Sequence, residues 1–218
     1  MTAAGPKLAV PPGRAGRLWL VRRIAVASRA ADVLDRKLRI LTAELDRLRG
    51  EAERTSQEWD SRCRQAEQWL LRAVLLGGER AVELAPATAE AELTISYAVT
   101  MGVRHPAGAR CVTGRPAGWE GPAVAQARQA HQAALTAAAQ HAAARAALAA
   151  VERETSITRY RLRAVRDRWI PRLRDALAQA DFSLEELERA DAARLRRAAP
   201  PGQAARGSRP GPSEPPRP

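Results

Sequence analysis

Residues 20–59, LVRRIAVASRAADVLDRKLRILTAELDRLRGEAERTSQEW, place an apolar or small residue at every third or fourth position with little interruption. This spacing continues for about five heptads, which is typical of a coiled coil and not of a short surface helix. The positions are Leu20, Ile24, Ala27, Ala31, Leu34, Leu38, Leu41, Leu45, Leu48, Ala52, Thr55 and Trp59. The pattern predicts one helix over residues 14–76, roughly 90 Å long, that ends at Gly77 and Gly78.

A second helical segment is predicted over residues 122–197, where the first part is rich in alanine and has a thin seam. From residue 148 the seam becomes clearer, and it continues on both sides of Pro171. Its positions are Leu148, Val151, Thr155, Thr158, Leu162, Val165, Trp169, Leu173, Leu177, Ala180, Leu184, Leu187 and Leu195. A proline inside a helix costs about 3 kcal/mol. The steps around it are four, four and four, so an extra residue of phase and a helix kink are expected at Pro171.

Between the two helices, residues 77–121 have a different pattern. Side chains alternate along EAELTISYAV, with Leu93, Ile95, Tyr97 and Val99 on one face, which predicts a half-buried strand. The segments RAVEL (80–84) and ARCVT (109–113) are weaker strand candidates. A small β-hairpin is therefore expected in this insert, with its pairing left open.

Two helices of similar length on either side of a short insert can bury their seams against each other. The predicted fold is all-α: a long antiparallel two-helix coiled coil with a small β-hairpin at or near the end opposite the termini. Residues 1–13 are expected to be an N-terminal extension, and the Pro- and Gly-rich residues 198–218 a disordered tail. A dimer of such chains would also satisfy the seams.

The formal net charge of +12 is compatible with three kinds of partner: a nucleic acid, an acidic membrane surface or an acidic protein. Lys7 and Lys37 are the only lysines, so arginine supplies nearly all the positive charge, a bias that genome composition also produces. Cys63 and Cys111 lack metal-type spacing and are expected to be free thiols in a reducing compartment. Neither a signal peptide nor a membrane span is expected.

The chain lacks the sequence patterns of common catalytic and nucleotide-binding sites, including phosphate-binding loops and dinucleotide fingerprints. His131 and His141 are ten residues apart and do not converge on one helix face, so neither a metal nor a cofactor is expected. Tyr160 and Trp169 lie in the basic run 159–174 on or near the seam, which favours core packing over base stacking. The acidic run 181–191 that follows is open to two interpretations, a solvated face or a surface that meets charged partners.

Three segments resemble the D subunit of V-type (A/V-type) ATP synthases. The first is the entry of the first helix, residues 10–45, with VLDRKLRIL at 33–41 matching a Leu- and Arg-rich element of that family. The second is YAVTMGVRHP at 97–106, similar to the family's N-x-M-G-V-x-x-P element. The third is RWIPRLRDALAQADFSLEELERADAARLRR at 168–197, in which the proline is itself part of the motif. The alanine-rich residues 123–147 and the tail show no such match.

The resemblance implies a non-catalytic central rotor shaft, which couples proton (or sodium) translocation to ATP synthesis or hydrolysis by rotation. In that family both termini enter a head of catalytic and regulatory subunits, the lower part with its hairpin binds the F subunit, and the base sits in a socket subunit on the membrane ring. The implied location is cytoplasmic and peripheral to the cell membrane. Direct nucleic-acid binding and membrane insertion are not expected.

The resemblance also points to interface residues. Those expected to face acidic loops of the head are Arg14, Arg17, Arg22, Arg23, Arg189, Arg194, Arg196 and Arg197. Those expected in the base element are Met101, Gly102, Val103 and Pro106. Two other classes of function stay open from the sequence: a basic coiled coil that binds nucleic acid, and a self-associating scaffold whose seams pair between chains.

Overall fold

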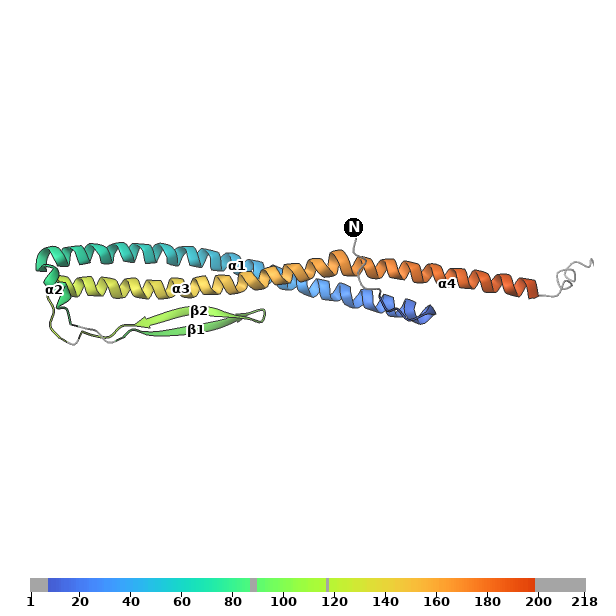
Figure 1. The fold of residues 1–218 in the computed structure, drawn as a ribbon, viewed down its shortest axis with the longest axis horizontal. Coiled ribbons are helices and arrows are strands. Elements are labelled where there is room, and N and C mark those ends of the chain that lie inside the picture. The colour runs from blue at the N-terminus through green and yellow to red at the C-terminus, as the bar shows by residue number, and fades with distance from the viewer. Residues whose placement is uncertain (1–7, 87–89, 117, 199–218) are drawn as a thin grey trace, which may run out of the picture. The chain divides into compact units, whose positions relative to one another are not determined.

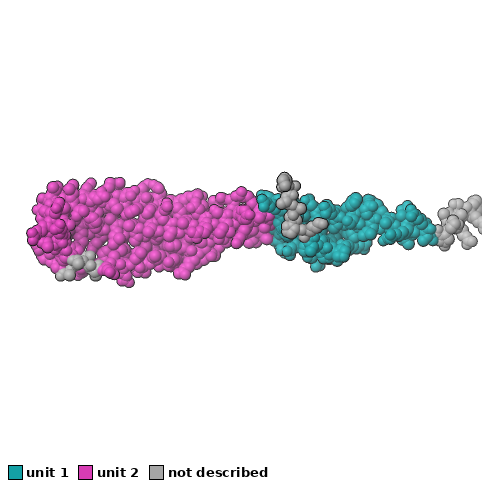
Figure 2. All heavy atoms as spheres, in the orientation of Figure 1, with its two compact units in different colours: residues 1–29, 166–218 teal, residues 30–165 magenta. Residues whose placement is uncertain are grey.

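The structure is a computed structural model that describes residues 8–86, 90–116 and 118–198. Its elements, in chain order, are α1 (Gly13–Gly77), α2 (Glu79–Glu83), β1 (Glu92–Thr100), β2 (Val103–Val112), α3 (Pro122–Arg163), a π-helical segment η1 (Ala164–Trp169) and α4 (Ile170–Ala198) (Figure 1). The chain forms two compact units, coloured separately in Figure 2. Unit 1 contains residues 1–29 and 166–218, and unit 2 contains residues 30–165.

In unit 2 the helices α1 and α3 run antiparallel. Lys37 pairs with Glu154, Thr55 contacts His141, and Ala73 packs with Val124, so ascending positions in α1 meet descending positions in α3. This arrangement confirms the predicted fold class for this part of the chain. The seam is the source of stability, because a helix of this length gains little from intrinsic propensity alone and much from burying an apolar face.

The seam changes character along unit 2. Leu41, Leu45 and Leu48 pack against the small residue Ala147 and against Val151. Further along α1, the large side chains give way to small ones: Ala66 packs with Ala130 and Ala134, and Ala73 with Val124 and Ala127. The partly buried Cys63 and Trp69 pack against these alanine clusters.

Three threonines at seam positions are buried: Thr55, Thr155 and Thr158. The Thr55 hydroxyl donates to the carbonyl of Glu51 at 2.9 Å, and the Thr155 hydroxyl donates to that of Val151 at 2.7 Å. Each of these two hydroxyls is therefore satisfied within its own helix, so a polar side chain is tolerated at a buried position.

Unit 1 also pairs two antiparallel helical segments, the start of α1 and α4. Leu20, Ile170 and Leu173 are buried there, while Arg14 pairs with Glu188 and Arg17 with Asp181 across the seam. At the start of α1, Gly16 is required by close packing, because an added Cβ would lie 1.9 Å from the carbonyl oxygen of Pro11.

The second long helical segment is interrupted by η1, which ends two residues before Pro171. A π-helix inserts one residue of phase relative to an α-helix. The phase change expected at this place is therefore present in the structure as η1. After it, the buried seam residues are Ile170 and Leu173, while Trp169 is only half-buried. Pro171 has no N–H, so one α-helical hydrogen bond is lost at this place in any case. The irregular hydrogen bonding of η1 lies just before it.

The insert forms an antiparallel hairpin, as predicted, with Glu92 opposite Val112 and Thr100 opposite Val103. Met101 and Gly102 make the turn, both with positive φ (49° and 83°), as a two-residue hairpin turn requires. The register shifts at one point: Ser96 lies opposite Gly108 and Tyr97 opposite Pro106, so one extra residue of β2 forms a bulge.

Several local predictions were wrong. Residues 80–84 fall largely in the short helix α2 and not in a strand, because Gly78, at φ 71°, lets the chain turn and start a new helix. By contrast, the strand candidate 109–113 is confirmed, since residues 109–112 belong to β2. The residues expected on the seam but found exposed are Trp59, Tyr160, Leu187 and Leu195, because the facing helix does not cover them fully. The proposed tail, apart from Ala198, and residues 1–7 lie outside the described residues.

Leu45→Ala should lower the free energy of unfolding by about 2–4 kcal/mol, because it removes buried methyl groups and leaves a cavity in the seam. The measurement is denaturant unfolding followed by circular dichroism at 222 nm. Leu71→Ala, at an exposed position of the same helix, is the matched control and should change it by less than about 0.5 kcal/mol. Equal losses in the two variants would contradict the seam described above.

Lys37 Nζ donates to Glu154 Oε1 at 2.7 Å between α1 and α3. This hydrogen bond, above all, lowers the pKa of Glu154 below the usual value of 4.5. Because the folded-state pKa is lowered, the pair stabilises the fold above about pH 4.5 and loses its contribution as the pH falls below that value. Glu154→Gln should therefore cost about 1 kcal/mol at pH 7 and almost nothing near pH 3.

The measurement is the free energy of unfolding of the wild type and of Glu154→Gln at both pH values. Glu67→Gln, on the exposed side of α1, serves as the control at pH 7, with an expected change below about 0.5 kcal/mol. If Glu154→Gln changes the free energy of unfolding by the same amount at pH 7 and at pH 3, the ionised pair is not the source of that change.

Candidate interaction surfaces

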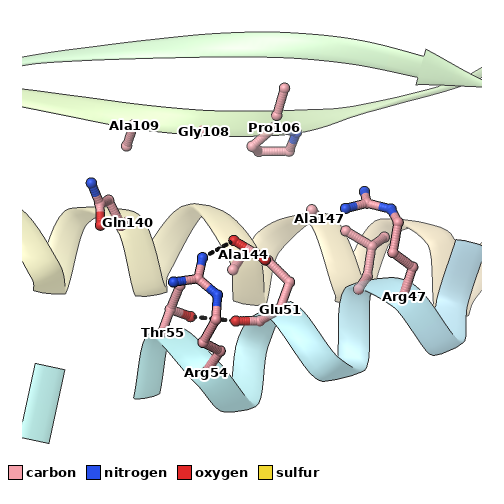
Figure 3. Close-up of a pocket in the computed structure, with 12 residues that line it drawn as sticks. Arg47, Glu51, Arg54, Thr55, Pro106, Gly108, Ala109, Gln140, Ala144 and Ala147 are labelled. Atoms are coloured by element: carbon pink, nitrogen blue, oxygen red, sulfur yellow. Dashed lines mark hydrogen bonds and ion pairs between the residues drawn. The ribbon is translucent and has the colours of Figure 1, made fainter. Parts of the chain in front are cut away.

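The hairpin is held against the helices of unit 2 through β2. This strand packs on α3, and both Figure 1 and Figure 3 show it running between α3 and β1. Val103, the first residue after the turn, packs against the cluster of Leu41, Leu45 and Leu48. The hairpin therefore extends back along the helix pair, so its turn lies beside the middle of α1 and not beside the helix ends, where the sequence led us to expect the β element.

His105 is the most buried residue of the hairpin, at 3% exposure. Its Nδ1 lies 3.0 Å from the carbonyl oxygen of Pro106, and its Nε2 lies 3.1 Å from the hydroxyl of Thr100. A carbonyl can only accept, so Nδ1 carries the proton and, in the neutral ring, Nε2 accepts from Thr100. The imidazole thereby ties β1 to β2 next to the turn, inside the contact with the helices.

Glu44 of α1 lies close enough to His105 for the two side chains to interact electrostatically. Both of its oxygens accept from Arg47, at 2.7 and 3.1 Å. These hydrogen bonds are the main reason that the pKa of Glu44 lies below its usual range, and the positive charge of Arg47 acts in the same direction. Glu44 is therefore a carboxylate at neutral pH, and Arg47 is already engaged by it.

A cavity of about 310 Å³ lies between β2 and the two helices (Figure 3). Figure 3 shows Pro106 and Ala109 pointing from the strand toward the helices, with Gln140 and Ala144 facing them from α3. The charged groups in its wall are compensated, since Arg54 donates to Glu51 at 2.7 Å. The small side chains of β2 leave this gap, so the hairpin is anchored mainly at Val103 and His105.

The hairpin exposes several large hydrophobic side chains that the described chain leaves uncovered. They are Leu93, Ile95, Tyr97, Val99, Met101 and Val112. The predicted half-burial of β1 was therefore wrong, because β2 and not β1 makes the contact with α3. Exposed apolar side chains gathered on one small element are typical of a protein–protein contact.

A second apolar surface surrounds the end of α1. A cavity of about 560 Å³ is lined there by residues of α1, α2 and the start of α3, and its rim includes Leu76, Leu84 and Trp119, the last 89% exposed. Arg128 fixes this end: its Nε donates to Glu120 at 2.8 Å and its Nη2 donates to the carbonyl of Pro86 at 3.0 Å. The loop segments next to α2 and α3 are thus held to the body of α3.

The eight arginines expected at an interface all lie in unit 1. Several are already engaged by carboxylates: Arg14 by Glu188, Arg17 by Asp181, Arg189 by Glu185 and Glu186, and Arg194 by Asp191. Arg23 stacks over Trp19 at 5.6 Å, and Arg196 donates to the carbonyl of Ala192 at 3.3 Å. The cross-helix pairs could not be predicted from spacing, because Arg14 and Glu188 are far apart in the chain.

The four residues expected in the base element lie together around the hairpin turn. Met101 is exposed and Gly102 completes the turn, while Val103 faces the helices and Pro106 lines the cavity beneath β2. Among these four, only Met101 offers a large side chain to a partner. The sequence singled out this motif as one unit but did not separate its inward from its outward residues.

Within the described residues, no group of three or more His, Cys, Asp and Glu side chains could hold a metal ion, and no helix is both long and apolar enough to cross a membrane. A model of the ATP synthase D-subunit family matches residues 18–199. This chain belongs to that family. A comparison with curated proteins returned no match. Membership makes the chain a stalk subunit of an ATP synthase, and so part of an enzyme complex formed with other ATP synthase subunits.

His105→Ala should loosen the hairpin of this D-subunit family member while leaving α1 and α3 intact. The substitution removes two hydrogen bonds and a buried ring, so amide exchange across residues 92–112 should accelerate by about tenfold to a hundredfold. The measurement is hydrogen–deuterium exchange read by mass spectrometry. Arg110→Ala, at an exposed hairpin position, is the control and should leave exchange unchanged. Unaltered exchange over 92–112 in His105→Ala would contradict the anchoring role.

Proposed function

We propose that this chain is the central rotor shaft of a V-type ATP synthase or ATPase, a non-catalytic subunit that couples proton (or sodium) translocation to ATP synthesis or hydrolysis by rotation. The observation that carries the proposal is the family match over residues 18–199. The paired antiparallel helices within each unit are consistent with it, since torque needs a seam that resists twisting. In the cell the chain would be cytoplasmic and bound peripherally to the membrane through its complex.

The mechanism follows from differential contact. As a shaft turns within a ring of catalytic and regulatory head subunits, each orientation presents different side chains to each catalytic interface and shifts its open and closed populations. The interface arginines of unit 1 are the proposed contacts with acidic loops of the head. Arg14 and Arg17 stiffen the helix pair through their carboxylate partners, which leaves Arg22 and Arg197 as exposed charges for the head.

Two further partners are proposed for unit 2. The exposed apolar row of β1, formed by Leu93, Ile95, Tyr97 and Val99, together with Met101 at the turn, is the proposed site for the F subunit. The apolar end around Leu76 and Trp119 is the proposed contact with the socket subunit of the membrane ring. Pro171, preceded by η1, is proposed to give the shaft a permanent kink, so that its orientations are inequivalent to the surrounding subunits.

One observation favours an alternative. Tyr160, which the sequence placed in the core, is exposed and lies in a basic run, a combination that suits stacking on nucleic-acid bases. A basic coiled coil that binds nucleic acid is therefore the second candidate. It predicts duplex binding that weakens steeply with salt, whereas the shaft needs no such binding.

Affinity purification of the tagged full chain from detergent-solubilised membranes of its host, read by mass spectrometry, tests the proposal. The expected result is recovery of V-type catalytic and regulatory subunits together with the F subunit. Ile95→Asp, in the apolar row of β1, should lose the F subunit and keep the head subunits, while Arg110→Asp should keep both. Recovery of the chain alone or with nucleic acid would refute the shaft.

A further inference from the structure

The two-stranded sheet of the hairpin leaves one of its edges open. β1 pairs with β2 on one side and, within the described residues, with no strand on the other. Because β2 runs between β1 and α3, the open edge is the one turned away from α3 (Figure 1). Seven of the nine residues of β1 are exposed. This strand lies entirely in unit 2, and its edge and both of its faces are accessible to another molecule.

The backbone groups at the open edge belong to alternate residues of β1. The two-residue turn makes Thr100 and Val103 a hydrogen-bonded pair. Antiparallel strands alternate such pairs, so the N–H and C=O of every second residue point away from β2. The bulge adds its extra residue on β2, which leaves the alternation along β1 unchanged. Counted back from Thr100, the residues with outward backbone groups are Val99, Tyr97, Ile95 and Leu93. They are the same residues whose side chains form the apolar row.

This edge lacks the features by which proteins usually prevent strand addition, which are charged side chains, proline and bulges. Residues 93–100, LTISYAVT, contain no charged residue, no proline and no glycine. Such residues occur on β2 instead, which has Arg104, Pro106 and Arg110 as well as the bulge. The strand with the open edge is therefore the unprotected one, and its sequence is compatible with pairing to a further strand.

We infer that two copies of this chain, before assembly with other subunits, pair through their β1 edges, with the two β1 strands antiparallel and Ser96 opposite Ser96 of the partner subunit. In this register Leu93 lies opposite Val99 of the partner subunit. Ile95 lies opposite Tyr97 of the partner subunit. Every residue with outward backbone groups then meets another such residue, so their N–H and C=O groups form hydrogen bonds with each other. A register shifted by two residues leaves Leu93 or Val99 opposite a residue outside the row.

The distribution of charge permits this contact. A net charge of +12 makes copies of the chain repel one another over much of their surface. Along the paired edges, however, Glu92 lies opposite Thr100 of the partner subunit, and no two charged residues of β1 face each other. The nearby Arg104 is on β2, where its guanidinium lies 4.2 Å from the ring centroid of Tyr97. Like-charge repulsion is therefore absent from the edge itself.

Strand pairing also explains the edge better than an apolar contact alone. A molecule that covered only the apolar side chains would remove water from the adjacent backbone groups without replacing their hydrogen bonds. A four-stranded sheet replaces them, and it extends a two-stranded sheet that is marginal by itself. A contact between two edge strands lies at the small end of protein interfaces, so the dimer is expected to be reversible, with a micromolar dissociation constant.

The inference goes beyond the proposed function and has one consequence for it. The proposed function assigns the apolar row of β1 to the F subunit, and one edge cannot pair with two occupants. The dimer is therefore a form of the unassembled chain, and it must dissociate before the F subunit binds.

Disulfide trapping in the purified full chain tests the register, in a background with Cys63→Ser and Cys111→Ser. Opposed residues that are not hydrogen-bonded have Cα atoms about 4.5 Å apart, within the range of a disulfide. Ser96→Cys should therefore give, after mild oxidation, roughly tenfold more disulfide-linked dimer on non-reducing electrophoresis than the matched control Thr94→Cys, whose own copy is not opposite. A mixture of Thr94→Cys and Ala98→Cys chains should restore the dimer, because these two positions face each other in the register.

Sedimentation velocity of the chain without cysteine substitutions provides the second readout. The wild type should pass from monomer to dimer between about 1 μM and about 100 μM. Ile95→Pro removes an outward N–H and keeps the hydrogen bonds between β1 and β2, so it should weaken dimerisation by about tenfold or more. Ile95→Val keeps that N–H and should dimerise like the wild type. Circular dichroism at 222 nm checks that both variants retain their helices.

Three results would overturn the inference. One is a wild type that stays monomeric at the highest concentration and gives no Ser96→Cys dimer. Another is equal trapping of Ser96→Cys and Thr94→Cys. The third is a dimer that Ile95→Pro leaves unchanged, which would indicate pairing through another surface such as the helix seams. Both measurements use this chain alone, so their outcome does not depend on whether the shaft proposal is correct.

Discussion

The structure depends on the burial of an apolar seam between antiparallel helices. In unit 2 this seam begins as leucine against alanine, where Leu41, Leu45 and Leu48 meet Ala147 and Val151, and becomes alanine against alanine near Ala66 and Ala130. Small residues on both helices bury little area each, so the stability of that part comes from length and close contact rather than from large side chains. The hairpin and the surface charges of this unit are positioned by the same pairing.

The hairpin shows how a seam determines a surface. Its inward strand β2 is anchored at Val103 and His105, and its remaining inward residues are small enough to leave a cavity beneath the strand. The apolar row of β1 is left without cover in the described chain. A two-stranded sheet of this size is marginal by itself in water, so the helices supply the support that lets the hairpin present an apolar face to a partner.

The charges divide into two groups with different physical roles. One group is satisfied internally, between helices as in Lys37 with Glu154 and Arg17 with Asp181, or within one helix as in Arg54 with Glu51. The other group, which includes Arg22, Arg29 and Arg36, projects from α1 without a partner in the described residues. The arginines that contribute to the net charge of +12 therefore differ in their effect on a partner. Only the unpaired ones are free to attract a carboxylate of another molecule.

The sequence by itself determined the two long helical segments and the presence of a hairpin between them, because a heptad repeat and a two-residue alternation each have one regular solution over many residues. It favoured antiparallel pairing of the two helices within the chain but left pairing between two chains open. It also located the irregularity before Pro171 through the change in phase. Only the tertiary structure decided which apolar residues are covered. Leu187 and Leu195 match the spacing yet are exposed, and β1 shows the alternation of a half-buried strand yet is exposed along most of its length, because burial depends on what stands opposite a residue. Only the structure showed that α2 is a helix, because its five residues are too few for periodicity to separate helix from strand. Only the structure also showed the cross-helix ion pairs, because they join residues that are distant in the chain.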